Sequence, residues 1–408
     1  MSRTINAFAS SLGFAPAQAQ GLQGWPESEP NAAAVLWHQE AAASVPIAFA
    51  QSLLSVFFGL IVESNPVHIA ALHAYWSAPS PSFVVLPRTT NEVFLVLKVI
   101  NSLHLTFSVR SGGHSPNPGW AGTRQPGLVN DLRRINQVAV TDEVVSLGPG
   151  ALSVIGGRIP SVRVGGGFSH FSSQYGLATD NVKKFEIVLG DGTITDVNAD
   201  NKPDLFWALK GGGANFGVVA RFDLYNIWYE IGQHNCSHTR ATVALIVGLD
   251  AIILDLIYSE PREERPACFA PFKTIPAITY PIPAADCTVL QLTQILDAAA
   301  SATLPQKPSS WGASTAANQT FILQPITAAV VKYGHDEGGK CLGLAAGNAQ
   351  CRGLRNGFVY MGDASRDQNL LASYGEENLE RLKAVSLKYD PGQVFQRLQN
   401  NGFLLSMV

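Results

Sequence analysis

Short apolar runs predict the first strands of this chain. The runs at 83–86 and 105–109 have the length and the Val, Leu and Phe content of short strands. Between them, Thr89 and Glu92 stand at the spacing of a capping box and predict a helix that extends to about Leu103. The second run therefore follows a helix, and it leads directly into a Ser-Gly-Gly-His sequence.

A polar turn between two apolar runs predicts a hairpin. The runs at 185–189 and 193–197 flank Gly190-Asp-Gly192. Residues 374–389 carry apolar side chains on one face and Glu, Lys and Arg on the other, which predicts an amphipathic helix. Further strands are predicted at 128–132, 138–140, 144–147 and 218–225, and a short helix at 204–210. Helix and strand alternate without the regularity of a doubly wound sheet, so we predict an α+β fold.

The character of the chain changes near residue 230. Residues 231–354 are rich in Pro and Ala and carry no recognisable chemistry, which indicates a second domain. Residues 1–65 are expected to form an irregular, partly helical lead-in. The predicted division is therefore 1–65, 66–230, 231–354 and 355–408, with regular structure resuming in the last part.

Composition excludes several classes of protein. The chain has 408 residues, of which 46% are hydrophobic and 14% charged, as in globular proteins. Its net charge of −3 and the absence of a long basic run argue against a nucleic-acid partner. The five cysteines form no C-x-x-C pair, so no metal site is predicted.

The uncharged stretch 41–62 is long enough to span a bilayer. Pro46, Gln51 and several small residues interrupt it, so a buried helix followed by a loop is the favoured interpretation. A membrane anchor is the alternative, although no stable membrane partner is expected. The N-terminal residues make a poor signal peptide.

Glycines cluster on both sides of His114. Gly112 and Gly113 precede it, and Gly165–Gly167 and Gly211–Gly213 follow. Backbone that approaches a phosphate-bearing ligand needs glycine, and such runs offer N–H groups to pyrophosphate oxygens. Gly148-Pro-Gly150 is not continued to a G-x-G-x-x-G motif. The pattern therefore predicts a flavin cradle rather than a dinucleotide fingerprint.

His114 carries the candidate chemistry of this cluster. A neutral imidazole nitrogen can attack the methyl carbon of a flavin ring, and a covalent link raises the reduction potential of the flavin. The alternative is a turn histidine that hydrogen-bonds backbone only. Asn181 has an amide that would fix either a flavin carbonyl or a loop.

With these motifs in place, residues 82–228 resemble the FAD-binding PCMH-type domain of berberine-bridge-enzyme-like oxidases, in the vanillyl-alcohol-oxidase superfamily. Residues near the C-terminus resemble the closing segment of that family, which returns to the FAD domain. The matching motifs are Pro87-x-Thr-x-x-Glu92, Arg110-Ser-Gly-Gly-His-Ser115, Tyr175-Gly-Leu-Ala-x-Asp-Asn-Val182, Pro203-Asp-Leu-Phe-Trp-Ala-Leu-Lys-Gly-Gly-Gly213, Asn215-Phe-Gly217, Tyr374-Gly-Glu-Glu-Asn-Leu-Glu-Arg-Leu-Lys383 and Tyr389-Asp-Pro-x-x-Val-Phe395.

The resemblance implies a split FAD domain of two α/β subdomains that encloses a smaller α+β substrate domain with an antiparallel sheet. It implies hydride transfer from an alcohol or amine-type carbon of a small molecule to FAD, followed by reoxidation by O₂. His114 takes the place of the flavin-linked histidine. Some relatives add a cysteine link, but no cysteine lies near Ile159 here, so one link is expected.

The resemblance also implies a set of residues around FAD. No catalytic residue is fixed by it. Tyr360, expected on a strand facing the flavin, is the candidate base, and a half-buried strand filler is the alternative. The implied cofactor-binding residues are Arg110, Ser111, Gly112, Gly113, His114, Ser115, Gly165, Gly166, Gly167, Asp180, Asn181, Val182, Gly217 and Val218.

Several departures from the family pattern support a second reading. The region 151–167 is short, Arg163 stands where a glycine is usual, and Gly362 stands where relatives place an asparagine. The region 230–350 is also shorter than a full substrate domain. The alternative is therefore an impaired member that has lost flavin binding through internal deletions. The resemblance favours secretion, while the substrate, the compartment, the oligomeric state and the choice between oxidase and dehydrogenase stay open.

Overall fold

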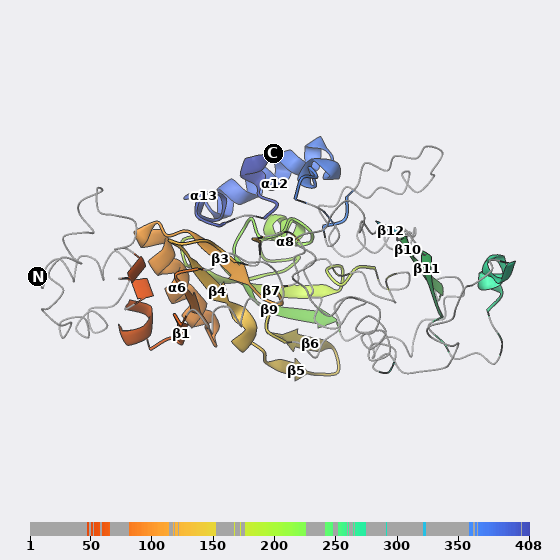
Figure 1. The fold of residues 1–408 in the computed structure, drawn as a ribbon, viewed down its shortest axis with the longest axis horizontal. Helices are drawn as coiled ribbons and strands as arrows, with labels where there is room; N and C mark the ends of the chain where they lie inside the picture. Colours follow the sequence, from red (N-terminus) through yellow and green to blue (C-terminus); the bar gives the residue numbers. More distant parts are fainter. Residues whose placement is uncertain are drawn as a thin grey trace, which may run out of the picture.

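The computed structural model contains three sheets and a set of helices, a mixed α+β arrangement that confirms the predicted fold class (Figure 1). It describes residues 47–48, 50–51, 53–57, 59–65, 81–113, 117, 119–120, 122–151, 167, 172, 176–225, 241–247, 252–258, 260, 264, 266–274, 291, 321–323, 359–361, 364, 366–400 and 402–408.

The first sheet has four strands in the order β1-β2-β4-β3. Strands β2, β4 and β3 run parallel, and β1 pairs antiparallel with β2. Parallel strands need a crossover connection, and helix α6 supplies it between β2 and β3, which lie on opposite sides of β4. The bounds are β1 Val62–Glu63, β2 Phe83–Val85, α6 Thr90–Leu103, β3 Phe107–Arg110 and β4 Leu128–Asp131.

Helix α6 begins at the predicted cap. The hydroxyl of Thr89 accepts a hydrogen bond from the Glu92 N–H at 3.2 Å, and the helix ends at His104 with a φ of 49°. Its inward face packs on the four-stranded sheet in a shared core. Buried members of this core include Val93, Val96, Leu97, Ile100, Phe83, Phe107 and Leu128. Each buried side chain of this size contributes about 1.5–3 kcal/mol, which fixes the helix against the sheet.

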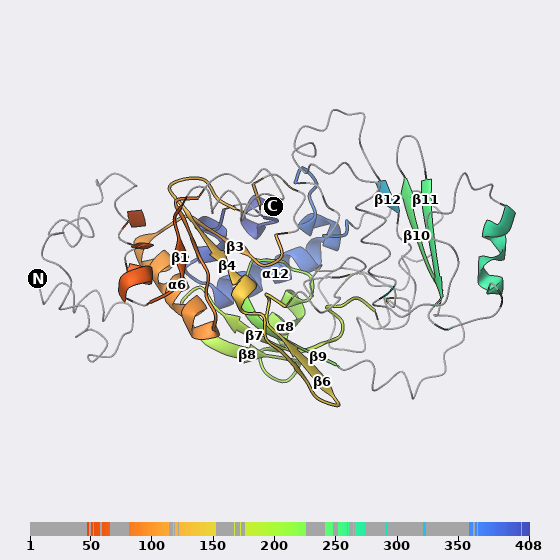
Figure 2. The ribbon, with the colours of Figure 1, turned by 60° about the horizontal axis from the view of Figure 1, so that its bottom comes forward.

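The second sheet has five antiparallel strands in the order β5-β6-β9-β7-β8 (Figure 2). The predicted hairpin is confirmed, because β7 pairs with β8 across a turn in which Gly192 has a φ of +88°. The bounds are β5 Val138–Val140, β6 Val144–Leu147, β7 Val182–Val188, β8 Ile194–Val197 and β9 Val218–Tyr225.

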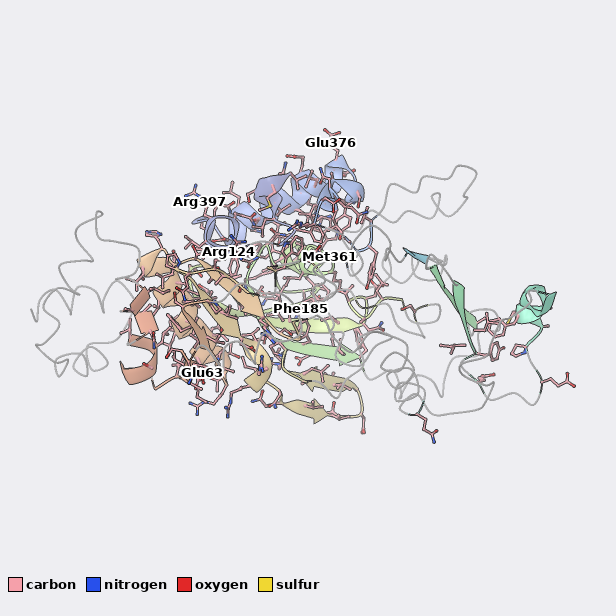
Figure 3. All side chains as sticks on the ribbon, viewed as in Figure 1. Glu63, Arg124, Phe185, Met361, Glu376 and Arg397 are labelled. Carbon is pink, nitrogen blue, oxygen red and sulfur yellow. The ribbon has the colours of Figure 1, made fainter. Side chains whose placement is uncertain are left out.

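Two helices cover this second sheet and share its core. Helix α8, Pro203–Leu209, contacts helix α12, Glu376–Tyr389. Phe185, labelled in Figure 3, lies edge-on to Phe206 and to Phe222, with centroid distances of 5.7 and 5.8 Å. Aromatic pairs in this geometry add to the burial of the rings.

The predicted helix 374–389 is corrected at its start. A 3-10 turn, η8 Leu371–Tyr374, comes first, and Gly375 with a φ of +94° separates it from α12. A residue in that conformation cannot continue a right-handed helix. Two short elements follow, α13 Val394–Arg397 and η9 Leu405–Met407.

A third, three-stranded sheet lies at the end of the molecule opposite α6 (Figures 1 and 2). Its strands are β10 Ala241–Val247, β11 Ile252–Tyr258 and β12 Phe321–Leu323, all antiparallel. A 3-10 element, η4 Ala267–Thr274, places Phe269 edge-on to Tyr258 at 6.4 Å. Most of 231–354 lies outside the described residues.

The uncharged stretch 41–62 contributes to the first core. Leu53 and Leu54, in the short π-helix η2 Leu53–Phe57, are fully buried there. Within the part of the chain that the structure describes, no helix has the length and apolar character needed to cross a membrane.

Candidate functional site

A glycine turn follows strand β3 at the edge where the parallel strands end. The strand closes with Arg110, and Ser111, Gly112 and Gly113 come next. Gly113 has a φ of +70°, and a Cβ there would lie 3.0 Å from Nε of Arg110. Among the described residues, no acceptor takes the N–H of Gly112 or Gly113. These N–H groups therefore suit an anionic ligand.

A second glycine-bearing segment lies against this turn. The hydroxyl of Ser111 donates to the Pro149 carbonyl at 2.8 Å. A Cβ on Gly148 or Gly150 would overlap the backbone of the 133–136 segment, so both positions need glycine for close packing. The segment therefore holds the turn in place by backbone contact.

The cationic side chain of the site is Arg110. Its Nε lies 3.6 Å from Oδ2 of Asp131, the fully buried last residue of the neighbouring strand β4. Burial lowers the pKa of Arg110, Asp131 raises it, and nearby Arg133 lowers it again. The guanidinium is thus held in a desolvated position beside the turn.

The predicted residues 180–182 build their own loop. The Asp180 carboxylate accepts from the Leu177 N–H at 2.8 Å, and the Asn181 amide donates to the Leu177 carbonyl at 2.9 Å. The Ala178 N–H donates to the Gly167 carbonyl at 2.7 Å, which brings Gly167 to this loop. Val182 is buried at the start of β7. The sequence left two roles open for Asn181, a contact to a flavin carbonyl and a contact within a loop. The loop contact is present among the described bonds of Asn181.

Gly217 and Val218 lie at the start of strand β9. A Cβ on Gly217 would come within 2.7 Å of the Val188 carbonyl oxygen, so β9 packs tightly on β7 there. Val218 is buried in the first core. Among the described residues, no backbone hydrogen bond joins this pair to the turn after β3, and their role around a cofactor stays a prediction.

Four of the predicted cofactor residues, His114, Ser115, Gly165 and Gly166, lie outside the described residues.

Tyr360 is described and half-buried, but it does not lie on a strand, which corrects the expectation. The Val359 N–H donates to the Ser373 hydroxyl at 3.0 Å, so a side chain of η8 holds this segment.

Sequence reasoning missed a clasp between the loop after the turn and the C-terminal segment. The Asn117 amide donates to the Ala364 carbonyl at 3.1 Å and accepts from the Arg366 N–H at 2.9 Å. The Asn400 amide donates to the Gly122 carbonyl at 2.9 Å. These partners are hundreds of positions apart in the chain, so no local sequence pattern predicts the contacts.

The geometry fits a phosphate-bearing cofactor. The turn offers backbone donors, a buried guanidinium lies beside them, and the buried hydroxyls of Ser108 and Thr179 have no partner among the described residues. A parallel sheet with a glycine turn at the ends of its strands places the chain in the class of folds that can bind a phosphate-bearing cofactor at that edge.

Comparison with known proteins identifies the cofactor. Residues 81–154 match a family described as "FAD binding domain". The chain is similar to 6-hydroxy-D-nicotine oxidase from Arthrobacter nicotinovorans, with a TM-score of 0.62, 17% identity and coverage of 82% of this chain and 96% of that one. It is also similar to xylooligosaccharide oxidase from Myceliophthora thermophila, with a TM-score of 0.59, 15% identity and coverage of 89% and 100%.

Curated relatives agree with this class. An FAD-dependent monooxygenase of Arthrobotrys oligospora is 29% identical over 423 residues, covering 80% of this chain and 82% of that protein. The FAD-dependent monooxygenase yanF of Aspergillus niger is 27% identical over 489 residues, covering 92% and 84%. The resemblance to FAD-linked oxidases is therefore confirmed, and the chain is an FAD-linked oxidoreductase with FAD as its cofactor.

The same alignments show that this chain is shorter inside. The match to the Arthrobotrys protein is 423 positions long although it uses only 80% of a chain of 408 residues. The relative therefore has residues at many positions where this chain has none. The shortening at 151–167 and at 230–350 in particular stays a prediction.

Proposed function

We propose that this chain oxidises an alcohol or amine-type carbon of a small molecule by hydride transfer to FAD, with O₂ as the final electron acceptor. Bound FAD supplies the two-electron acceptor for such a reaction. The observation that carries the proposal is the glycine turn Arg110–Gly113, which lies inside the matched residues 81–154. Two solved structures that the chain resembles, xylooligosaccharide oxidase and 6-hydroxy-D-nicotine oxidase, support a small-molecule donor.

The proposed binding residues divide by task. The N–H groups of Gly112 and Gly113 would hold diphosphate oxygens, and Arg110 would lower the cost of the negative charge there. His114 would hold the flavin ring covalently through one imidazole nitrogen. The further members of the proposed cradle are Ser111, Ser115, Gly165–Gly167, Asp180, Asn181, Val182, Gly217 and Val218.

Tyr360 is the proposed base. Its neighbour Met361, labelled in Figure 3, approaches the glycine loop after α8, because a Cβ on Gly213 would lie 3.1 Å from Cε of Met361. The clasp at Asn117 holds the same segment against the loop that follows His114. This arrangement supports a role for Tyr360 in accepting the proton of a substrate hydroxyl as the hydride leaves.

We also propose that the FAD domain is split, with 66–230 and 355–408 enclosing a shortened substrate domain at 231–354 and preceded by the lead-in 1–65. Contacts between the two parts support this division. The Tyr374 hydroxyl donates to the Gly211 carbonyl at 3.0 Å, and the buried Asn215 amide donates to the Phe403 carbonyl at 2.9 Å.

The second candidate is a protein that has kept this fold and lost flavin binding. The alignment with the Arthrobotrys protein supports internal shortening of this chain. A shortening at 151–167, which carries part of the proposed cradle, would favour this candidate. Such a protein would perform no hydride transfer. It would show no flavin absorbance after purification as a folded chain.

The visible absorption spectrum of the acid-precipitated protein separates these candidates. We expect flavin bands in the pellet, and their release into the supernatant for His114→Ala. A coloured supernatant from the unaltered chain would contradict the covalent link, and a colourless folded protein would contradict flavin binding. With flavin present, a donor screen that reads H₂O₂ tests the use of O₂, because an oxidase forms one H₂O₂ for each donor oxidised.

A further inference from the structure

A buried carboxylate lies beside the glycine turn. Asp131 ends strand β4 and is fully buried, and the sheet register places it next to Arg110 at the end of β3. An ionised carboxylate removed from water costs several kcal/mol unless charged partners and hydrogen bonds compensate it. The compensation for Asp131 must therefore come from its immediate neighbours.

Two arginines provide it. Oδ1 of Asp131 accepts from the Arg133 N–H at 3.1 Å and from its Nε at 3.0 Å, and Oδ2 accepts from Nη2 at 2.6 Å. Nε of Arg110 lies 3.6 Å from Oδ2. One carboxylate is thus shared by two guanidinium groups, and these three side chains together carry a net positive charge.

Each arginine belongs to a different wall of the site. The side chain of Arg110 lies against Gly113, so a displaced Arg110 side chain would enter the space of the turn. The Arg133 carbonyl faces Gly150 so closely that no Cβ would fit between them. The Ser111 hydroxyl joins the two walls at Pro149. Asp131 therefore fixes both walls through its two arginines.

We infer that Asp131 is a positioning residue of the FAD site, which holds Arg110 under the glycine turn so that the cluster favours the diphosphate of FAD over an uncharged flavin. The inference rests on the proposed function, which places the diphosphate at this turn. Asp131 itself would repel a phosphate, so its effect on the diphosphate is transmitted through Arg110. A desolvated guanidinium gains more from an approaching anion than an exposed one, because water screens it less.

The test compares binding of FAD with binding of riboflavin, which lacks the diphosphate. Both are titrated into full-length His114→Ala protein by flavin fluorescence, so that the flavin exchanges freely. Asp131→Asn is expected to weaken FAD binding by about tenfold, the change that loss of one charge-assisted contact produces. Riboflavin binding is expected to stay within about twofold, since it makes no contact with the cluster.

Arg110→Gln provides a second route to the same answer. It should reproduce the selective loss for FAD, and the double variant should lose no more than either single variant, because both changes remove one interaction. If Asp131→Asn does not fold, Asp131→Glu, which keeps the charge but lengthens the side chain, takes its place and should show the same selective loss. Asp223→Asn is the matched control, because that carboxylate is also buried and paired with Arg221, in the five-stranded sheet.

The outcomes separate the two proposals. Equal weakening of FAD and riboflavin, or unchanged binding of both, would overturn the role of Asp131 while leaving flavin binding intact. A protein with Asp131 in place that binds neither ligand would overturn this inference together with the proposed function. Selective loss of FAD in both variants, but not in Asp223→Asn, would support it.

Discussion

The two larger sheets satisfy their polar groups in different ways. In the five-stranded sheet, Arg221 contacts Glu186 at 2.7 Å and Asp223 at 3.1 Å, so the charged side chains of β7 and β9 pair with one another. In the four-stranded sheet, the Ser108 hydroxyl and both amide atoms of Asn130 are buried with no partner among the described residues. Each such group costs about 1–3 kcal/mol. The first arrangement is complete in itself, and the second has unmet hydrogen-bonding capacity.

The glycines of the two regions also differ in what surrounds them. A Cβ on Gly190, in the turn between β7 and β8, would meet the carboxylate of Asp390, which is buried and held by the Phe395 N–H. Among the described residues, the atoms nearest to a Cβ on Gly113 belong to the flexible side chain of Arg110, and there the φ of +70° demands glycine. One glycine serves packing of the fold, and the other serves the shape of a turn that presents donors. The comparison teaches that glycine alone does not mark a ligand site, and that its neighbours must be known.

The largest effect is expected in the five-stranded region. Phe185→Ala removes a buried ring between two aromatic partners and should lower the free energy of unfolding by about 3–5 kcal/mol. Urea unfolding followed by tryptophan fluorescence measures it, with the exposed Val140→Ala as control, expected within about 0.5 kcal/mol. If the folded variant also lost its flavin, the separation between the two regions would be wrong.

A matched pair of glycine variants sharpens the contrast. Gly190→Ala should destabilise the chain by about 1–3 kcal/mol through overpacking while the folded protein keeps its flavin, because Gly190 is not part of the proposed cradle. Gly113→Ala should cost about 1–2 kcal/mol of backbone strain and should also reduce flavin content. Thermal unfolding and the ratio of flavin to protein absorbance measure both. Equal flavin content in the two variants would contradict the assignment of Gly113 to the site.

A smaller gain in stability is expected at Asn130. Asn130→Val replaces a buried amide that has no hydrogen-bond partner among the described residues by an apolar side chain suited to a strand. It should stabilise the flavin-free chain by about 1 kcal/mol. The measurement compares the urea midpoints of the unaltered chain and Asn130→Val at equal pH. A loss of stability would mean that the amide has a hydrogen-bond partner, such as a buried water.

The smallest effect is a pH dependence at Asp204. Burial raises the pKa of this carboxyl. Hydrogen bonds from Lys388 at 2.6 Å and Tyr389 at 2.8 Å lower the pKa by more than burial raises it, so the net shift is downward. A depressed folded-state pKa adds stability above the unfolded value, which is lost as pH falls through the folded value. Wild type should therefore exceed Asp204→Asn near neutral pH and converge with it below about pH 4. A difference unchanged by acid would contradict this.

Local signals predicted much of the fold. The cap at Thr89, the turn at Gly190–Gly192 and the strand at 218–225 were all readable because each depends on neighbours in sequence. The start of α12 was misplaced by two residues because Gly375 looks harmless in an amphipathic pattern until its φ is known. Tyr360 was misplaced because a strand needs a pairing partner, which periodicity does not supply.

The site shows a sharper limit. The turn at Arg110–Gly113 was predicted by its glycines, and FAD by the motifs around it. Asp131 and Asn117 were missed, because their importance comes from partners on other elements: Arg110 on the next strand, and a segment reached only after the chain has returned. The sequence shows which residue types are present near a ligand, but the residues that position them depend on tertiary contacts.

The Asn400 contact with Gly122 joins residues that are 278 positions apart in the chain. Synthesis at roughly 5–20 residues per second means that the loop after the glycine turn is exposed for tens of seconds before this partner exists. During that interval the first sheet and helix α6 can already form from local segments. A nascent chain therefore carries the local strand pairs of the first sheet before Val394 and Phe395 join its core and before the Asn400 contact is made.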